Sequence, residues 1–519
     1  FVPDRVAKLI DTAPWPPTRQ WRAWSSRFGA RRLGPPGAEP MEHKLFIAGE
    51  WVESAGGITF QDLNPATGEL IGNIHQATKE NVERAIDAAY SARTSWANTP
   101  AAFRERILLK AADLTESQTG ALADLLTTET GAAVGFAHFQ VHLMTDFLRA
   151  MAGECRRVCG ETMPMLQPGQ FSMSVRRPLG VVAGIGPFNA ALILPLKKVA
   201  MALAAGNTFV LKPSEETPII GLKIAEIFSA AGLPPGVLNV VSGPGPDIVQ
   251  QLVADPRVKL ITFTGSDKVG RILAVEAAKH FKRFVAELGG KNPFIVLKDA
   301  DLDYAVDCAA FGIYMHQGQV CMANSRIIVE DPVYDEFCAR FVAKTRTIKV
   351  GDPRDPSTVI GPIMRKSHCA FVDAHIQDAV AKGAKLLTGG THDGPFYQPT
   401  VLADVTPAMK VYDEETFAPV TSILRVKNAD HALQVANDTS YGLSSSVMTR
   451  DIDTALKFAE QLEAGMVHIN DCTLHDEPTA PFGGVKNSGF GRENGRYGIE
   501  EMTEVKWITI QSGRRAFPF

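Results

Sequence analysis

The sequence lacks the long uninterrupted apolar segments that cross membranes. A spanning helix needs about 18 or more consecutive apolar residues. The best candidate, residues 190–211, is interrupted by Pro195, Lys197, Lys198 and Asn207. We therefore expect neither an integral membrane protein nor a membrane partner.

Neither sign of charge is in marked excess. The 519 residues include 53 lysines and arginines against 57 aspartates and glutamates, a formal net charge of -4. Binding of nucleic acid through bulk electrostatics is therefore not indicated. Apolar residues make up 45% and charged residues 21% of the chain, which is typical of soluble globular proteins. The length predicts about two to four domains.

Cysteine is scarce and odd in number, with seven residues in the whole chain. This count predicts free thiols in a reducing compartment, and therefore a cytoplasmic protein. Cys155 and Cys159 lie four residues apart, but no second pair completes a zinc-binding spacing. No glutamate follows His138 on the way to His142, as a metalloprotease helix requires. We expect no metal site.

The first 40 residues differ in composition from the rest. They are rich in proline and arginine and contain few acidic residues, whereas Met41 begins a conventional-looking start. Two interpretations are open: a targeting presequence, which would indicate a mitochondrial location, or an unstructured or non-native extension. On either interpretation residues 1–40 are not part of the fold, which we expect to begin at Met41.

From residue 180 the sequence alternates short apolar runs with segments of helical periodicity. This pattern predicts strands at 180–185, 208–212 and 236–241, with helices at 190–205 and 218–231. Such alternation is typical of parallel βαβ units, which bind ligands at the carboxyl ends of their strands.

Further segments complete this α/β pattern. Helical spacing is found at 80–96 and across 103–129, and a second alternating block covers about 293–471. The tail alternates like a strand over 504–511. Because an isolated strand is not stable alone, we expect this tail to pair with another domain or subunit.

Cys321 is the cysteine with the most reactive setting. Gly318 precedes it closely within Tyr314–Arg326, so backbone can approach the thiol. Thirty-four residues earlier, Glu287 ends an apolar run and is followed by Gly289 and Gly290. A carboxylate at a strand end beside two glycines can change position, which suits a mobile general base.

Two other motifs follow predicted strands. Gly265 and Ser266 open a helix after the strand at 258–262, and the N–H groups at such a helix start can bind a phosphate. Lys212 and Glu215 lie just beyond the strand at 208–212. Either motif alone would be weak evidence for a binding site.

Together and in this order, these four motifs resemble those of the NAD(P)-dependent aldehyde dehydrogenase superfamily. The resemblance covers about residues 45–510 and includes Gly186–Asn189, Glu414–Pro419 and Pro481–Arg492. The last of these, with the residues just before it, is similar to benzaldehyde, vanillin and salicylaldehyde dehydrogenases. The resemblance implies a Rossmann-like cofactor domain, an α/β catalytic domain and a small β oligomerisation flap.

The resemblance also implies a mechanism. Cys321 is the expected nucleophile, which forms a thiohemiacetal with the aldehyde and then a thioester. Asn189 and the backbone N–H of Cys321 are expected to hold the oxyanion. Glu287 is expected to activate the hydrolytic water. Lys198 matches a position that supports proton movement, although a structural role is an equal alternative.

The expected cofactor is NAD rather than NADP. Lys212 and Glu215 match the positions that bind the adenine ribose, where a carboxylate repels a 2′-phosphate. Gly265 and Ser266 should contact the pyrophosphate, and Glu415 the nicotinamide ribose. The full predicted set is Ile185, Phe188, Lys212, Glu215, Gly245, Gly265, Ser266, Leu288, Glu415 and Phe417.

The expected substrate is an aromatic aldehyde. Apolar residues around the nucleophile suggest a water-poor tunnel, and the small Ala190 leaves room for a flat ring. The predicted lining is Ala190, Ile193, Leu194, Lys197, Val320, Met322 and Leu474. Lys197 could contact a phenolic hydroxyl or carboxylate on the ring, with extension into solvent as the alternative.

The resemblance further implies a division of the chain and an oligomer. Residues 41–156 and 178–289 should form the NAD-binding domain, 290–485 the catalytic domain, and 157–177 with 486–519 the flap and tail. The flap implies a homodimer or homotetramer. The alternatives are a thiol-dependent esterase or acyl transferase, an aliphatic aldehyde dehydrogenase, and a non-catalytic protein of the same fold.

Overall fold

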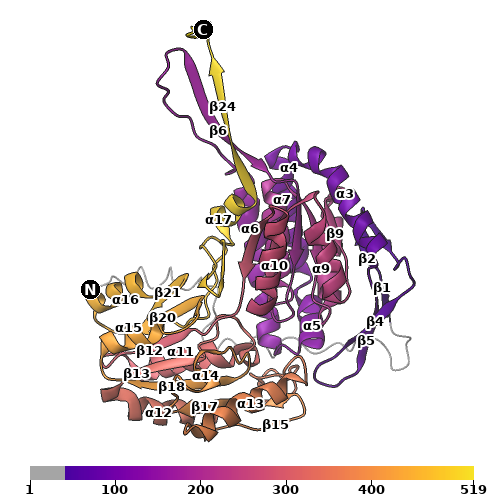
Figure 1. Cartoon of the computed structure of the whole chain (residues 1–519). Coiled ribbons are helices and arrows are strands. Elements are labelled where there is room, and N and C mark those ends of the chain that lie inside the picture. Colours follow the sequence, from indigo (N-terminus) through magenta and orange to yellow (C-terminus); the bar gives the residue numbers. More distant parts are fainter. Residues whose placement is uncertain (1–40) are drawn as a thin grey trace, which may run out of the picture.

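The computed structural model describes residues 41–519 (Figure 1), and the expectations for residues 1–40 lie outside this range. Its first large sheet has eight strands. In spatial order they are β23 (Gly489–Phe490), β11 (Arg283–Glu287), β10 (Val258–Thr264), β7 (Val181–Ile185), β8 (Thr208–Lys212), β9 (Leu238–Val240), β2 (Leu45–Ile47) and β3 (Glu50–Val52).

The five central strands of this sheet are parallel. Their order changes direction between β7 and β10, because β8 and β9 continue on one side of β7 and β10 and β11 on the other. A ligand crevice forms at such a reversal, beyond the carboxyl ends of the strands. The predicted strand at 208–212 coincides with β8, and that at 180–185 with β7 to within one residue.

Side chains alternate between the two faces of this sheet, as the two-residue repeat of a strand requires. Val181 and Ile185 pack with α3 (Lys79–Ala97), α9 (Gly245–Ala254) and α10 (Asp267–Lys279). Val182 and Phe209 face the opposite cluster. The helices of that cluster are α4 (Ala101–Ser117), α5 (Thr119–Thr130), α6 (Val134–Glu154), α7 (Ile193–Ala205) and α8 (Pro218–Ala230).

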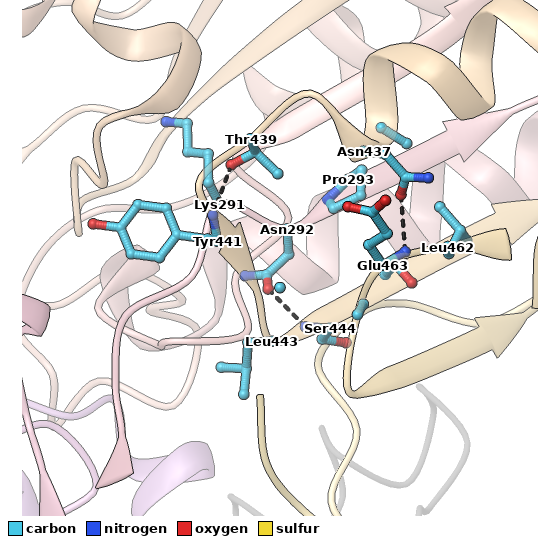
Figure 2. Close-up of a pocket in the computed structure, with 14 residues that line it drawn as sticks. Lys291, Asn292, Pro293, Asn437, Thr439, Tyr441, Leu443, Ser444, Leu462 and Glu463 are labelled. Atoms are coloured by element: carbon cyan, nitrogen blue, oxygen red, sulfur yellow. Dashed lines mark hydrogen bonds between the residues drawn. The ribbon is translucent and has the colours of Figure 1, made fainter. Parts of the chain in front are cut away.

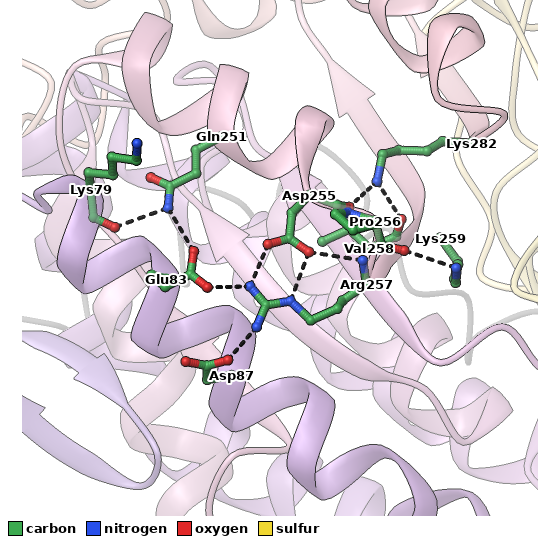
Figure 3. A network of polar contacts seen from close by, with 10 residues as sticks. All are labelled: Lys79, Glu83, Asp87, Gln251, Asp255, Pro256, Arg257, Val258, Lys259 and Lys282. Carbon is green, nitrogen blue, oxygen red and sulfur yellow. Dashed lines mark hydrogen bonds and ion pairs between the residues drawn. The ribbon is translucent and has the colours of Figure 1, made fainter.

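The stretch 103–129, which carries helical spacing throughout, forms two helices. The break falls at Gln118, whose φ of -102° and ψ of 12° end α4 and begin α5. Ion pairs also join the first sheet to α3: Arg257 contacts Asp255 in its own loop and Glu83 and Asp87 on the helix (Figure 3).

The second large sheet has seven strands, of which only the edge strand β14 is antiparallel to its neighbour. In spatial order they are β14 (Lys385–Thr388), β17 (Thr400–Ala403), β18 (Val420–Val426), β13 (Arg326–Glu330), β12 (Pro293–Val296), β20 (Ser444–Met448) and β21 (Met466–Ile469). Its associated helices are α11 (Leu302–Tyr314), α12 (Asp331–Thr345), α13 (His368–Ala381), α14 (Lys410–Asp413), α15 (Ala429–Asn437) and α16 (Ile452–Gln461).

The tail strand β24 (Thr503–Gln511) follows α17 (Gly495–Glu501) and pairs with β6 (Gln170–Pro178) over its whole length. The predicted strand therefore finds its partner within the same chain. This two-stranded ribbon extends away from both sheets (Figure 1). The smaller sheets are formed by β1 (Met41–His43), β5 (Leu70–His75) and β4 (Thr59–Leu63), by β15 (His392–Asp393) with β16 (Phe396–Tyr397), and by β19 (Tyr441–Gly442) with β22 (Val485–Lys486).

The expected α/β fold class is confirmed, whereas the expected domain boundaries remain a proposal. Strand β23 falls in the proposed tail segment 486–519, yet it pairs with β11 at the edge of the first sheet. Among residues 41–519, no helix combines the length and apolarity needed to cross a membrane.

Candidate active site

Cys321 follows a strained turn between the two sheets. The turn is the 3-10 segment η2 (Met315–Gly318), in which His316, Gln317 and Gly318 all have positive φ values of 50°, 49° and 69°. Non-glycine residues in this region cost about 1–2 kcal/mol each. Such strain persists only where surrounding contacts fix the backbone.

Those contacts come from several parts of the chain. The Gln317 amide donates to the Pro362 carbonyl at 2.9 Å, and the Gln319 side chain accepts from the Met364 N–H at 3.0 Å. The His316 ring stacks on Phe136 of α6 with centroids 4.7 Å apart. Burial lowers the pKa of His316 to about 4, so the ring is neutral at neutral pH.

Asn292 fixes the backbone of the nucleophile itself. Its side-chain N–H groups donate to the carbonyls of Cys321 at 2.8 Å and Ala323 at 2.9 Å. Its oxygen accepts from the Ser444 N–H at 3.0 Å (Figure 2). Asn292 was not among the residues predicted from the sequence. The available signal was an asparagine at the start of a buried strand, three residues after Gly289.

The Cys321 thiol is half-buried in apolar surroundings. Burial, reinforced by the nearby carboxylates of Glu415 and Glu287, raises its pKa to about 12, while Lys197 acts in the opposite direction. In this arrangement the thiol is protonated at neutral pH. Because the thiolate is the nucleophile, a group near the site has to accept its proton before it attacks.

Asn189 lies beside the same turn. It follows β7, is buried, and donates from its side-chain nitrogen to the Gln319 carbonyl at 2.9 Å. Gln319 precedes Cys321 by two residues, so this hydrogen bond holds the Asn189 amide close to the nucleophile. The geometry is compatible with the predicted oxyanion-binding role, which requires amide donors preorganised near the reacting carbon.

Glu287 ends β11 as a buried carboxylate, and neither of its oxygens has a hydrogen-bond partner within residues 41–519. A Cβ placed on Gly483 would lie 2.7 Å from its Oε1, so glycine gives the carboxylate its space. Burial and the neighbouring Glu493 raise its pKa well above the usual range, against the influence of Lys198. An unsatisfied buried carboxylate calls for a functional explanation.

Lys198 forms a buried ion pair with Glu493, and its Nζ also donates to Thr262 at 3.2 Å. Since Glu493 and Lys198 both influence the pKa of Glu287, the three groups form one electrostatic cluster. Lys198 and Glu287 were predicted from the sequence, whereas Glu493, which is 206 residues from Glu287, was not. The role of Lys198 in proton movement stays a prediction.

The predicted ribose pair lies at the end of β8. The Lys212 Nζ is 2.7 Å from Glu215 Oε2, and a Cβ on Gly245 would lie 3.8 Å from that Nζ. Burial lowers the pKa of Lys212. Burial would raise the pKa of Glu215, but the Lys212 ammonium more than offsets this and lowers it.

The other predicted cofactor residues lie beyond neighbouring strands. Ser266 caps α10, and the Gly265 N–H donates to the Glu287 carbonyl at 3.1 Å. Glu415 accepts from the Gly290 N–H at 2.9 Å, and burial raises its pKa to about 7. The remaining members are Ile185 at the end of β7, Leu288 after β11, and Phe188 and Phe417, whose rings meet edge to face at 6.0 Å.

The predicted substrate residues fall into two groups, which pack in different apolar clusters. Val320 and Met322 flank Cys321 and pack in one apolar cluster with Leu474. Ala190, Ile193 and Leu194 belong to the cluster of α7. Lys197 does not extend into solvent: its side chain is 0% exposed and pairs with Asp476 at 2.8 Å. The solvent alternative for Lys197 is therefore wrong.

A cysteine and a buried carboxylate beside a doubly wound parallel sheet are features of α/β enzymes that combine covalent catalysis with dinucleotide binding. The model of the aldehyde dehydrogenase family matches residues 51–508. The chain belongs to the aldehyde dehydrogenase family, as its motifs predicted.

Three similar proteins illustrate this relationship. A vanillin dehydrogenase of Pseudomonas fluorescens is 44% identical, covering 91% of this chain and 99% of its own. The crystal structure of a salicylaldehyde dehydrogenase from Pseudomonas putida G7, complexed with salicylaldehyde, superimposes with a TM-score of 0.91 at 40% identity, covering 92% and 100%. The crystal structure of an NAD-dependent aldehyde dehydrogenase from Sinorhizobium meliloti superimposes with a TM-score of 0.91 at 37% identity, and the match covers 92% of this chain and 96% of that one.

Proposed function

We propose that the protein oxidises an aromatic aldehyde to its carboxylic acid with NAD. The observation that carries this proposal is that Cys321 follows a strained turn beside Asn189, while the Glu287 carboxylate at the end of β11 is buried and has no hydrogen-bond partner within residues 41–519. The similarity to vanillin and salicylaldehyde dehydrogenases supports the aromatic substrate class.

Each of these residues has one role in the proposed reaction. The Cys321 thiol gives up its proton through water to solvent, and the resulting thiolate adds to the aldehyde carbon, while the Asn189 amide and the Cys321 backbone N–H hold the oxyanion. Bound NAD supplies the acceptor for the hydride that leaves this carbon. The resulting thioester on Cys321 is hydrolysed by a water whose proton passes to Glu287. The pair of Lys198 and Glu493 adjusts the proton affinity of Glu287.

The residues at the strand ends fit a dinucleotide. Lys212 and Glu215 present a cation and a carboxylate beyond β8, which suits ribose hydroxyls and disfavours a 2′-phosphate. Gly265 and Ser266 open α10, whose N-terminus favours a pyrophosphate. Glu415 lies against Gly290, near enough to Cys321 to influence its pKa. This arrangement supports NAD as the cofactor, as does the NAD-dependent relative.

The test is a comparison of aldehydes by the absorbance of NADH. Benzaldehyde, salicylaldehyde, vanillin, hexanal and acetaldehyde are each assayed with NAD and with NADP. We expect kcat/KM for the best aromatic aldehyde with NAD to exceed that for either aliphatic aldehyde at least tenfold. A preference for aliphatic aldehydes would overturn the substrate class, and ester cleavage without reduction of either cofactor would favour the thiol esterase.

We also propose that the protein forms a homodimer or homotetramer in the cytoplasm. The ribbon of β6 and β24 exposes large apolar side chains that water does not favour: Phe171, Val505, Trp507 and Ile510. Sedimentation analysis of the native protein and of a Trp507→Ser variant tests the role of the ribbon: association should weaken in the variant.

The cytoplasmic location is supported by the cysteines. All seven are free thiols, which suits a reducing compartment.

A further inference from the structure

Arg365 extends from the segment before α13 to the loop that follows β8. Its Nε donates to Glu216 at 2.6 Å, and a terminal nitrogen lies 3.7 Å from the carboxylate of Glu215. Its guanidinium lies 5.7 Å from the centre of the Phe188 ring. Glu215 and Phe188 are both predicted to contact the cofactor, so this cation borders the cofactor site from the side of the second sheet.

The side chain of Arg365 keeps donors for a ligand. It is 48% exposed, and within residues 41–519 its two terminal nitrogens have no hydrogen-bond acceptor. The bond to Glu216 uses the N–H on Nε, which leaves the N–H groups of both terminal nitrogens. These groups form a planar fork that matches two oxygens of a phosphate.

The backbone before this side chain is fixed by the turn that precedes the nucleophile. The Met364 N–H donates to the Gln319 side chain at 3.0 Å, and the Pro362 carbonyl accepts from Gln317 at 2.9 Å. Together with the bond from Nε to Glu216, these contacts restrict the position of the guanidinium before a ligand arrives. Such preorganisation reduces the entropic cost of binding.

Arg365 lies between the residues assigned to the two ends of the dinucleotide. On one side is Glu215, assigned to the adenine ribose. On the other side, the Phe188 ring meets Phe417 edge to face, and Phe417 follows Glu415, assigned to the nicotinamide ribose, by two residues. The pyrophosphate joins the two riboses, so it has to pass this point.

The predicted cofactor residues lack a free cation for the pyrophosphate. Gly265 and Ser266 offer neutral donors at the start of α10. Lys212 lies 2.7 Å from Glu215, so its charge is already balanced. A pyrophosphate within a dinucleotide carries two negative charges, and charge-assisted bonds from an arginine are among the strongest that such a group accepts. Arg365 supplies the missing charge.

We propose that Arg365 binds the pyrophosphate of the dinucleotide through its two terminal nitrogens, while its Nε stays on Glu216. This inference rests on the proposed function and adds a cationic residue to the recognition of the cofactor. Because NAD and NADP share the pyrophosphate, Arg365 should favour the binding of both, whereas Glu215 should separate them.

The test measures binding to the native enzyme and to Arg365→Met. NADH is followed by its fluorescence, and ADP-ribose and adenosine by displacement of NADH. We expect NADH and ADP-ribose, which contain the pyrophosphate, to bind to the variant about tenfold or more weakly. Adenosine, which has no phosphate, should bind equally to both proteins. In turnover, KM should rise by the same factor for NAD and for NADP, while kcat changes little.

Two further variants control for charge and for geometry. Lys366→Met removes a neighbouring exposed charge that has no ion-pair partner among residues 41–519, and it should leave all three affinities unchanged. Arg365→Lys keeps the charge but lacks the planar fork, so its affinity for ADP-ribose should lie between those of the native enzyme and Arg365→Met. All three variants should melt close to the native temperature, because exposed ion pairs contribute little to stability.

The outcomes separate the two proposals. Unchanged binding of ADP-ribose to Arg365→Met, or an equal loss in Lys366→Met, would overturn the role of Arg365 while leaving an NAD-dependent aldehyde dehydrogenase. An equal loss for adenosine would also overturn it, because the effect would then come from the adenine ribose. Absence of NADH binding to the native enzyme, with no reduction of NAD by any aldehyde, would overturn the proposed function and this inference with it.

Discussion

The side-chain amide of Asn292 donates a hydrogen bond of 2.8 Å to the backbone carbonyl of Cys321. The same amide nitrogen also donates to the Ala323 carbonyl at 2.9 Å, and the amide oxygen accepts from the Ser444 N–H in the neighbouring strand β20. One buried side chain therefore ties the nucleophile to two strands of the second sheet. The position of the thiol is set by tertiary contacts as much as by its own turn.

Replacement of Asn292 by alanine should reduce both stability and turnover. Two buried carbonyls lose their donor, at about 1–3 kcal/mol for each unsatisfied group, and a displaced nucleophile can lower kcat about a hundredfold. Thermal melting and steady-state kinetics measure the two effects. Asn239→Ala is the matched control, because Asn239 is a buried bridging amide in β9. It should lower stability and spare kcat; equal kcat for both variants would contradict the positioning role.

Gly318→Ala should destabilise the protein strongly. Its φ of 69° is costly for alanine, by about 1–2 kcal/mol, and the added Cβ would overlap the Ala418 carbonyl. We expect a total loss of more than about 3 kcal/mol in the free energy of unfolding. Gly394→Ala isolates the backbone cost, since Gly394 has a φ of 57° with nothing within 4 Å of its Cβ position. Equal losses at both positions would show that the contact with Ala418 is unimportant.

Glu287→Gln should stop turnover after the first hydride transfer. Without the base the thioester on Cys321 persists, so NADH should appear as one burst followed by a steady rate about a hundredfold or more below native. In the native enzyme the raised pKa of Glu287 means that the hydrolytic rate should increase with pH as this carboxyl ionises. A burst-free, uniformly slowed reaction would instead place Glu287 before the hydride transfer.

The same raised pKa makes a prediction about stability. The folded protein holds the Glu287 proton more tightly than the unfolded chain, so this contribution is present below the ordinary glutamate pKa and is lost as pH rises through the folded pKa. Glu287→Gln should therefore melt at a higher temperature than the native protein at alkaline pH and show little gain in acid. Melting curves across pH measure this difference, and a gain confined to acid would contradict it.

Glu215→Gln should weaken the preference for NAD over NADP by about tenfold or more. The change removes the charge that repels a 2′-phosphate and releases Lys212, its partner at 2.7 Å, to contact that phosphate. The ratio of kcat/KM for the two cofactors measures the effect. Glu226→Gln is the control, because Glu226 pairs with Lys223 on the exposed side of α8. An unchanged ratio in Glu215→Gln would remove Glu215 from cofactor selection.

Local sequence patterns were sufficient to predict the strands β7 and β8 of the cofactor sheet and the motifs at their ends. Short apolar runs between Gly and Pro residues define β7 and β8 almost to the residue, because strand periodicity and chain breakers act locally. The motifs that carry Cys321 and Glu287 are also local, and this is why they identified the family before any fold was known.

The partners of the buried charged groups could not be predicted from local patterns and became known from the folded chain. Asp476 lies 279 residues from Lys197, and Glu493 lies 295 residues from Lys198. No local pattern relates such distant positions, and a lysine with an apolar stem is compatible with either solvent or a buried carboxylate. Lys197 is buried only when helix α7 and the loop after β21 pack together. A charge in the low dielectric of the interior is then stable only beside an opposite charge.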